Sequence, residues 1–350
     1  MKSNKLMYLS LCSLAGMLAI SGAAQADESA YSQQAARSAL ASGLGRSTAR
    51  VLKRGSLDRS AVAAGLATAF GDRAAGTSLL PDGAVVLVAD DWRIAVAADG
   101  TAAQGQRVSA AAPPVPTRLD LATLERLGRE FISARLSTLV APRADERIVV
   151  LRSMYEVLGG QDVSGRRDPD LVRANRIVFG RSIDGLRVVG GGSTISITFG
   201  TDGAPVSFEV DWPSYAVAST VPVASTAAIL GRVQRVSAAR AGGAAAAAPL
   251  PRLDTSRGYP TEVARGVQLS RLECGYFDPG MFTKLGIDTV QPGCKYEVVQ
   301  STAVGGNVLR NGLGGAVPAA VTAVPDARWP ELQLLSGVAG GAPAPGSASR

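Results

Sequence analysis

The chain has 350 residues, of which 36 are Lys or Arg and 29 are Asp or Glu, so its formal net charge is +7, and it contains no histidine. The lack of histidine excludes Ser-His-Asp and Cys-His catalysis and the usual zinc sites. The arginines are scattered along the chain and do not form a stripe interleaved with aromatic residues, which disfavours nucleic-acid binding.

The first 26 residues predict an export signal. Lys2 and Lys5 precede an apolar run from Leu6 to Ile20, and small residues then end in an Ala-Gln-Ala sequence. We expect cleavage before Asp27 and a mature protein in the periplasm or outside the cell, with no integral membrane span. An uncleaved anchor is the alternative, and the shortness of the apolar run disfavours it.

Two cysteines, Cys274 and Cys294, remain after the signal is removed. In an oxidising compartment an even pair predicts a disulfide, which would stabilise a loop of this size by roughly 3 kcal/mol. Two free thiols are the alternative, but they would require a reducing location.

Residues 27–112 predict alanine-rich helices followed by a β-hairpin. The low content of β-branched residues from Ser29 to Phe70 favours two or three short helices, the last with Val62, Leu66 and Phe70 on one face. Apolar runs at 84–89 and 92–98, bounded by Asp-Gly pairs, predict the hairpin.

Residues 117–218, which follow a proline-rich linker, predict a first helix-plus-sheet unit. Asp120 is placed to cap a helix that runs to about Leu136, and strands are expected at 147–157, 193–199 and 206–212. Asp202 and Gly203 predict a tight hairpin turn between the last two strands, because glycine adopts positive φ without steric cost.

Residues 219–336 predict a second unit of the same kind. Ser225 or Thr226 can cap a helix that runs to about Val236, and a low-complexity linker leads to strands at 263–276 and 294–299. Residues 337–350 are expected to form a disordered tail. The predicted fold class is therefore α+β, with two helix-on-antiparallel-sheet units after an alanine-rich helical and hairpin region.

Three short motifs resemble the FTP and PepSY modules of thermolysin-type propeptides. They are VFGR at 178–181, GxxVxG at 185–190 and IxIxFxxDG at 195–203, and the resemblance covers about residues 119–300. Members of this kind act as chaperones or inhibitors of secreted metallopeptidases, or stand alone as periplasmic modules. No His-Glu-x-x-His motif follows here, so the resemblance implies a free-standing PepSY-like module without catalytic residues.

The strongest catalytic candidates are Glu209 and Asp211, two carboxylates on one predicted strand. A separation of roughly 7 Å between alternate strand residues lies within the window of about 6.5 to 9.5 Å for inverting glycosidases. A solvated outer face explains the pair equally well, and we favour that interpretation. The glycines at 190–192 resemble a phosphate-binding loop but lack its lysine, so a turn between strands is expected.

No catalytic residues, cofactor or metal ligands are predicted. Tyr276, Phe277 and Phe282 in the disulfide loop would form a binding surface if they were exposed together, whereas the usual burial of aromatic residues favours their covering the end of the second sheet. We expect an exported, non-catalytic binding or scaffold protein of the bacterial envelope, with an envelope protein or peptide as its partner. The alternatives are a modulator of secreted peptidases and a carboxylate-based hydrolase.

Overall fold

The computed structural model describes residues 45–71, 74–109, 112–160, 169–229, 231–233, 265–278, 289–304 and 307–321. Within them, strands far outnumber helices. The elements are β1 (Thr48–Gly55), α2 (Arg59–Phe70), β2 (Ala74–Leu79), β3 (Val85–Ala89), β4 (Trp92–Val96), β5 (Ala102–Arg107), α3 (Leu121–Arg135), β6 (Glu146–Leu158), β7 (Leu171–Ile183), β8 (Leu186–Gly190), β9 (Thr194–Phe199), β10 (Pro205–Asp211), β11 (Ser214–Pro222), β12 (Arg265–Asp278), β13 (Thr289–Val304) and β14 (Asn307–Pro318).

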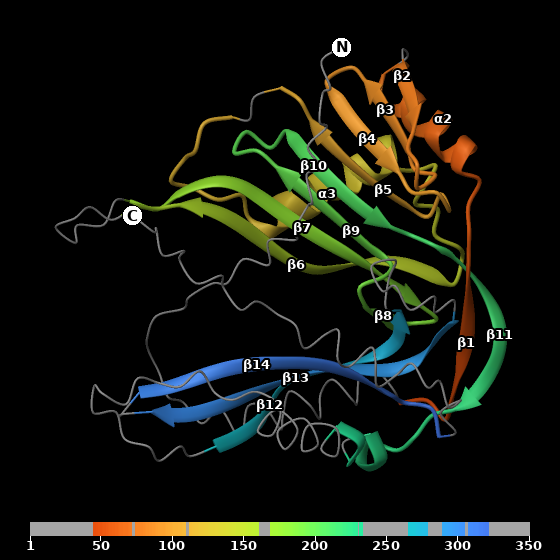
Figure 1. Ribbon diagram of the computed structural model, residues 1–350, viewed down its shortest axis with the longest axis vertical. Helices are drawn as coiled ribbons and strands as arrows, with labels where there is room; N and C mark the ends of the chain where they lie inside the picture. The colour runs from red at the N-terminus through yellow and green to blue at the C-terminus, as the bar shows by residue number, and fades with distance from the viewer. Residues whose placement is uncertain are drawn as a thin grey trace, which may run out of the picture.

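All of these strands join one mixed, 14-stranded sheet in the order β11-β1-β13-β12-β8-β7-β9-β10-β5-β4-β3-β2, with β14 beside β13 and β6 beside β7. Figure 1 shows two groups of strands, one containing β2–β7, β9 and β10 and the other containing β12–β14. The paired strands β1 and β11 run along one side and bridge the groups. A parallel pairing between β8 and β12 makes a second link.

The largest hydrophobic core lies between the first group of strands and the helices α2 and α3. Alternate residues of β9 and β10, including Ile195, Ile197 and Phe208, are buried there beside Leu66 and Phe131 of the two helices. Strand alternation places these side chains on one face of the sheet, so the helices cover that face.

Helix α3 begins where the sequence predicts, because Asp120 accepts a hydrogen bond from the backbone N–H of Thr123 at 2.8 Å. Hydrogen bonds from the backbone N–H and the hydroxyl of Thr123 lower the pKa of the Asp120 carboxyl. Helix α2 begins in the same way at Asp58, whose carboxylate accepts hydrogen bonds from the backbone N–H groups of Ser60 and Ala61. Each cap satisfies N–H groups that a helix leaves unpaired at its start.

A second core forms around the predicted disulfide, which is confirmed. Cys274 and Cys294 face each other across β12 and β13 and are bonded. Ile229 and Val233, from helical residues that follow Ser225, pack in this core together with Tyr296.

The predicted fold class is wrong. The strands assigned to two separate helix-on-sheet units are hydrogen-bonded into one sheet, and Tyr276 of the second unit lies beside Val188 of the first. The helices predicted for residues 29–70 are also partly wrong, because Thr48–Gly55 forms the strand β1, whereas Arg59–Phe70 forms the expected last helix. Residues 29–44 lie outside the described residues. The largest core mixes residues of segments 27–112 and 117–218, so it does not divide at the proline-rich linker.

Candidate functional site

Four aromatic side chains from distant parts of the chain meet at the end of the first core. Phe70 ends α2, Trp92 begins β4, Phe131 lies on α3 and Phe208 on β10. The ring centroid of Phe70 lies 5.1 Å from that of Trp92 and 5.4 Å from that of Phe208. Edge and offset contacts at such distances add stability beyond area burial.

Gly105 on β5 leaves the space that these aromatic contacts require. It pairs with Phe208 on one side and with Ile94 on the other, so β5 separates the strands that carry Phe208 and Trp92. A Cβ atom at Gly105 would overlap the ring of Phe208. The missing side chain therefore lets the Phe208 ring lie across β5 and reach Trp92, at a centroid distance of 5.7 Å.

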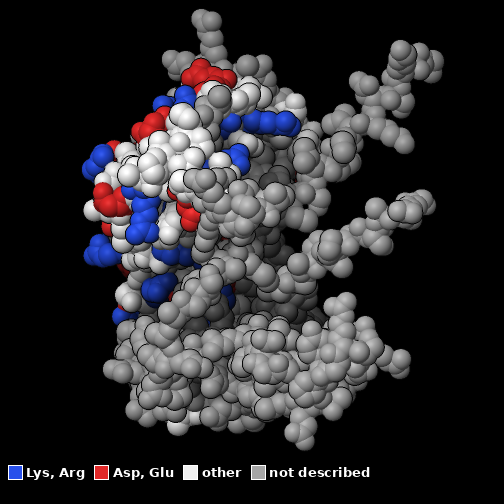
Figure 2. Space-filling model, turned by 90° about the vertical axis from the view of Figure 1, so that its left-hand side faces the viewer, with Lys and Arg blue, Asp and Glu red and all other residues white. Residues whose placement is uncertain are grey.

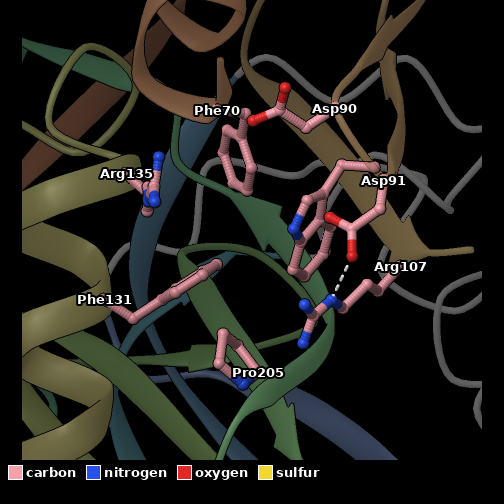
Figure 3. A pocket seen from close by; sticks show the side chains of 8 residues that line it. Phe70, Asp90, Asp91, Arg107, Phe131, Arg135 and Pro205 are labelled. Carbon is pink, nitrogen blue, oxygen red and sulfur yellow. Dashed lines mark hydrogen bonds and ion pairs between the residues drawn. The ribbon is translucent and has the colours of Figure 1, made fainter. Parts of the chain in front are cut away.

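A cavity of about 330 Å³ opens beside these rings, and Figure 3 shows its lining. Phe70, Trp92, Phe131 and Pro205 form its apolar wall. Its charged lining consists of Asp90, Asp91, Arg107 and Arg135. An apolar wall with a few polar groups at its edge is the usual composition of a small-molecule site, and this volume lies at the lower end of the range for such sites.

The four charged residues of the pocket differ in their partners. The Nε–H of Arg107 donates to Asp91 Oδ2, which also accepts from the Ser109 hydroxyl at 2.9 Å. The hydrogen bond from Arg107 is the main reason why the pKa of Asp91 is lowered. Arg135 donates to the backbone oxygen of Ala69, in the last turn of α2.

A buried cluster of charged and polar groups forms a second candidate site, where β1, β10 and β12 approach one another. Arg54 contacts Asp278 at 2.6 Å and Asp211 at 3.1 Å. The Asp278 side chain is fully buried and that of Asp211 is 5% exposed. The two carboxylates raise the pKa of Arg54 against the opposing effect of burial, which is the largest single influence.

Tyr215 continues this cluster into β11. Its hydroxyl donates to Asp278 and lies 2.7 Å from the Ser193 hydroxyl. Burial is the main cause of its pKa being raised well above 10, and the neighbouring Asp278 carboxylate adds to the shift. Ser193 has a left-handed backbone with φ of 54°, and the preceding Gly192 packs so closely that a Cβ there would overlap the Asp278 carboxylate.

Arg181 on β7 is a further buried charged residue, and it lies next to Tyr215. Its guanidinium lies 3.9 Å from the ring centroid of Trp212 and donates to the backbone oxygen of Pro213 at 2.7 Å. The Glu146 carboxylate is 3.7 Å away. Burial lowers the pKa of Arg181. Since these groups are enclosed and contact one another, we interpret the cluster as a link between the two groups of strands and not as a site open to ligands.

The structure places the candidate catalytic pair, Glu209 and Asp211, two residues apart on β10. Glu209 is exposed, whereas Asp211 is buried and ion-paired with Arg54. The two carboxylates therefore occupy different environments, and Asp211 has a structural role in the cluster. The glycines at 190–192 form the predicted turn, which lies against the Asp278 main chain and carboxylate.

The candidate aromatic surface of the disulfide loop is not exposed where the structure describes it. Tyr276 is 1% and Phe277 is 9% exposed. The Tyr276 hydroxyl accepts a hydrogen bond from the backbone N–H of Arg50 at 3.3 Å, and burial raises its pKa. Phe282 lies outside the described residues. Tyr276 and Phe277 thus fit the alternative interpretation, in which aromatic residues cover the end of a sheet.

Sequence reasoning missed the pocket, although it identified Phe70 as a member of an apolar helix face. Gly105, a glycine within the strand Ala102–Arg107, is a local signal that could have indicated close packing by another residue. That signal does not reveal which ring approaches.

Among the described residues, no group of three or more acidic or cysteine side chains is arranged to hold a metal ion. No helix in the same part of the chain is both long and apolar enough to cross a membrane. On the face shown in Figure 2, basic and acidic side chains of the described residues are interspersed. A scan against protein-family models gives no match, and a search of curated proteins gives no significant match.

Proposed function

We propose that this chain is an exported, non-catalytic binding protein of the bacterial envelope, and that the aromatic pocket is its ligand site. The observation that carries the proposal is the cavity of about 330 Å³ with an apolar wall and a charged edge. Export is supported by the predicted signal and by the disulfide between Cys274 and Cys294, since disulfides persist in oxidising compartments.

Binding without turnover is favoured by how the pocket's polar groups are engaged. Asp91 accepts hydrogen bonds from Arg107 and Ser109, and its lowered pKa keeps it an ionised acceptor at neutral pH. A general acid or base works best with a pKa near the working pH, and the shift of Asp91 is in the opposite direction. The groups at the pocket edge therefore suit recognition of a ligand better than proton transfer.

A library of small aromatic and aliphatic molecules tests the proposal by ligand-observed NMR. We expect saturable binding of at least one member, with one site per chain and unchanged ligand signals after prolonged incubation. The variant Pro205→Phe should weaken that binding, because the larger ring narrows the pocket, and Arg93→Gln on the same sheet should leave it unchanged. Consumption of the ligand, or no saturable binder, would refute the proposed function.

A further inference from the structure

We infer that the pocket selects a small organic anion with an apolar body, such as a short arylalkyl carboxylate. The inference rests on the proposed function and adds the chemical class of the ligand. It comes from the positions and the free hydrogen-bond donors of the two arginines that line the cavity.

Arg107 reaches the pocket from β5. Only its Nε–H is engaged, by Asp91, and no described residue accepts a hydrogen bond from its two terminal amino groups. Figure 3 shows its guanidinium directed toward the middle of the lining residues. The ion pair with Asp91 therefore fixes the guanidinium while leaving a pair of parallel donors for a ligand.

Arg135 reaches the same cavity from the last turn of α3, on the side of α2. One amino group donates to the Ala69 backbone oxygen, and the guanidinium carbon lies 5.6 Å from the Phe70 ring centroid. No carboxylate among the described residues forms an ion pair with Arg135. Both guanidinium groups line the cavity from different elements, so each can donate charge-assisted hydrogen bonds to an anion bound there.

Asp90 limits what the pocket can bind. Its carboxylate packs against Gly71 at the end of α2 and forms no hydrogen bond or ion pair with a described residue. With Asp91, it makes the charged lining neutral in sum, so an anion is held by directed hydrogen bonds and not by excess charge. A zwitterion would use Asp90 as a partner, whereas a simple anion is repelled by it. The sign of the effect of removing the Asp90 charge separates these two ligands.

The apolar wall limits the size and shape of the uncharged part of the ligand. Phe70, Trp92 and Phe131 are each less than 9% exposed and pack on one another, so they offer ring edges at the end of the cavity and no open stacking face. The volume of about 330 Å³ admits one small ring or a short chain.

The test uses three probes of matched shape, namely 3-phenylpropionate, 3-phenylpropanol and 3-phenylpropylamine, measured by isothermal titration calorimetry with the whole chain. We expect the carboxylate to bind about tenfold or more tightly than the alcohol, as hydrogen bonds to a charged group allow, and the amine to bind more weakly still. Arg107→Gln and Arg135→Gln should each weaken carboxylate binding about tenfold. Arg93→Gln, an exposed residue outside the pocket, is the matched control and should change nothing.

Asp90→Asn should tighten carboxylate binding by about two- to fivefold, since it removes a like charge from the lining of the pocket. Weaker binding in Asp90→Asn, or equal binding of the alcohol, would overturn the inference and leave the proposed function standing. Binding of none of the three probes would count against both. Arg135→Lys retains the charge without the planar fork and should give intermediate binding, and it keeps the test decisive if Arg135→Gln fails to fold.

Discussion

Replacing Arg54 with methionine tests whether the buried cluster holds the two groups of strands together. The substitution keeps most of the side-chain volume but leaves two carboxylates, Asp211 and Asp278, without their cation in surroundings where they are 5% and 0% exposed. At an effective dielectric constant near 20, each charge pair at about 4 Å contributes about 4 kcal/mol before desolvation of the arginine is subtracted. Breaking a buried pair by removing one partner costs about 3–5 kcal/mol, and we expect a loss in that range.

The assay is urea denaturation followed by far-ultraviolet circular dichroism, with Arg126→Met as the control. Arg126 pairs with Glu130 on α3, but both side chains are about three-fifths exposed at 61% and 60%, so its removal should cost only about 0.3–0.5 kcal/mol. The triple variant that also carries Asp211→Asn and Asp278→Asn should recover part of the loss, because no unpaired charge is left buried. If Arg54→Met loses no more stability than the control, the cluster does not stabilise the junction of strands.

Three further changes probe the same region and the second core. Gly192→Ala should cost about 1–3 kcal/mol in urea denaturation, because the added methyl group overlaps the Asp278 carboxylate; an unchanged midpoint would contradict that packing. Since the folded-state pKa of Tyr215 is raised, the unfolded chain loses this proton first, and stability should fall as the pH rises above about 10. Tyr215→Phe should show a shallower fall of melting temperature between pH 9 and 11, and parallel curves would refute the assignment. Replacing both Cys274 and Cys294 with alanine should cost about 3 kcal/mol and make denaturation insensitive to dithiothreitol, whereas the wild type should lose a similar amount on reduction.

Local sequence patterns were sufficient for several elements. The strands at 85–89 and 92–96, helix α3 with its Asp120 cap, and the hairpin of β9 and β10 all form where the sequence predicts them. Each depends on residues close in sequence, namely a cap, an alternating pattern or a two-residue turn. The disulfide was also predictable, because only one pair of cysteines remains after the predicted signal.

Strand β1 shows why other parts were not predictable. Val51 and Leu52 are adjacent and both buried, because a register shift against β11 lies between them and breaks the alternation of buried and exposed residues. Strand β11 has mostly exposed residues, so burial does not alternate along it either. Neither strand therefore shows the regular alternation of buried and exposed residues on which a strand prediction depends.

By itself, the amino-acid sequence determined several local elements, the charge, the lack of histidine and the pair of cysteines. Only the tertiary structure decided that the strands form one sheet, that Arg54 lies between Asp211 and Asp278, and that Phe70, Trp92 and Phe131 surround a cavity. The physical reason is that these contacts join residues tens to hundreds of positions apart, and burial and charge pairing select them only once the whole sheet is assembled.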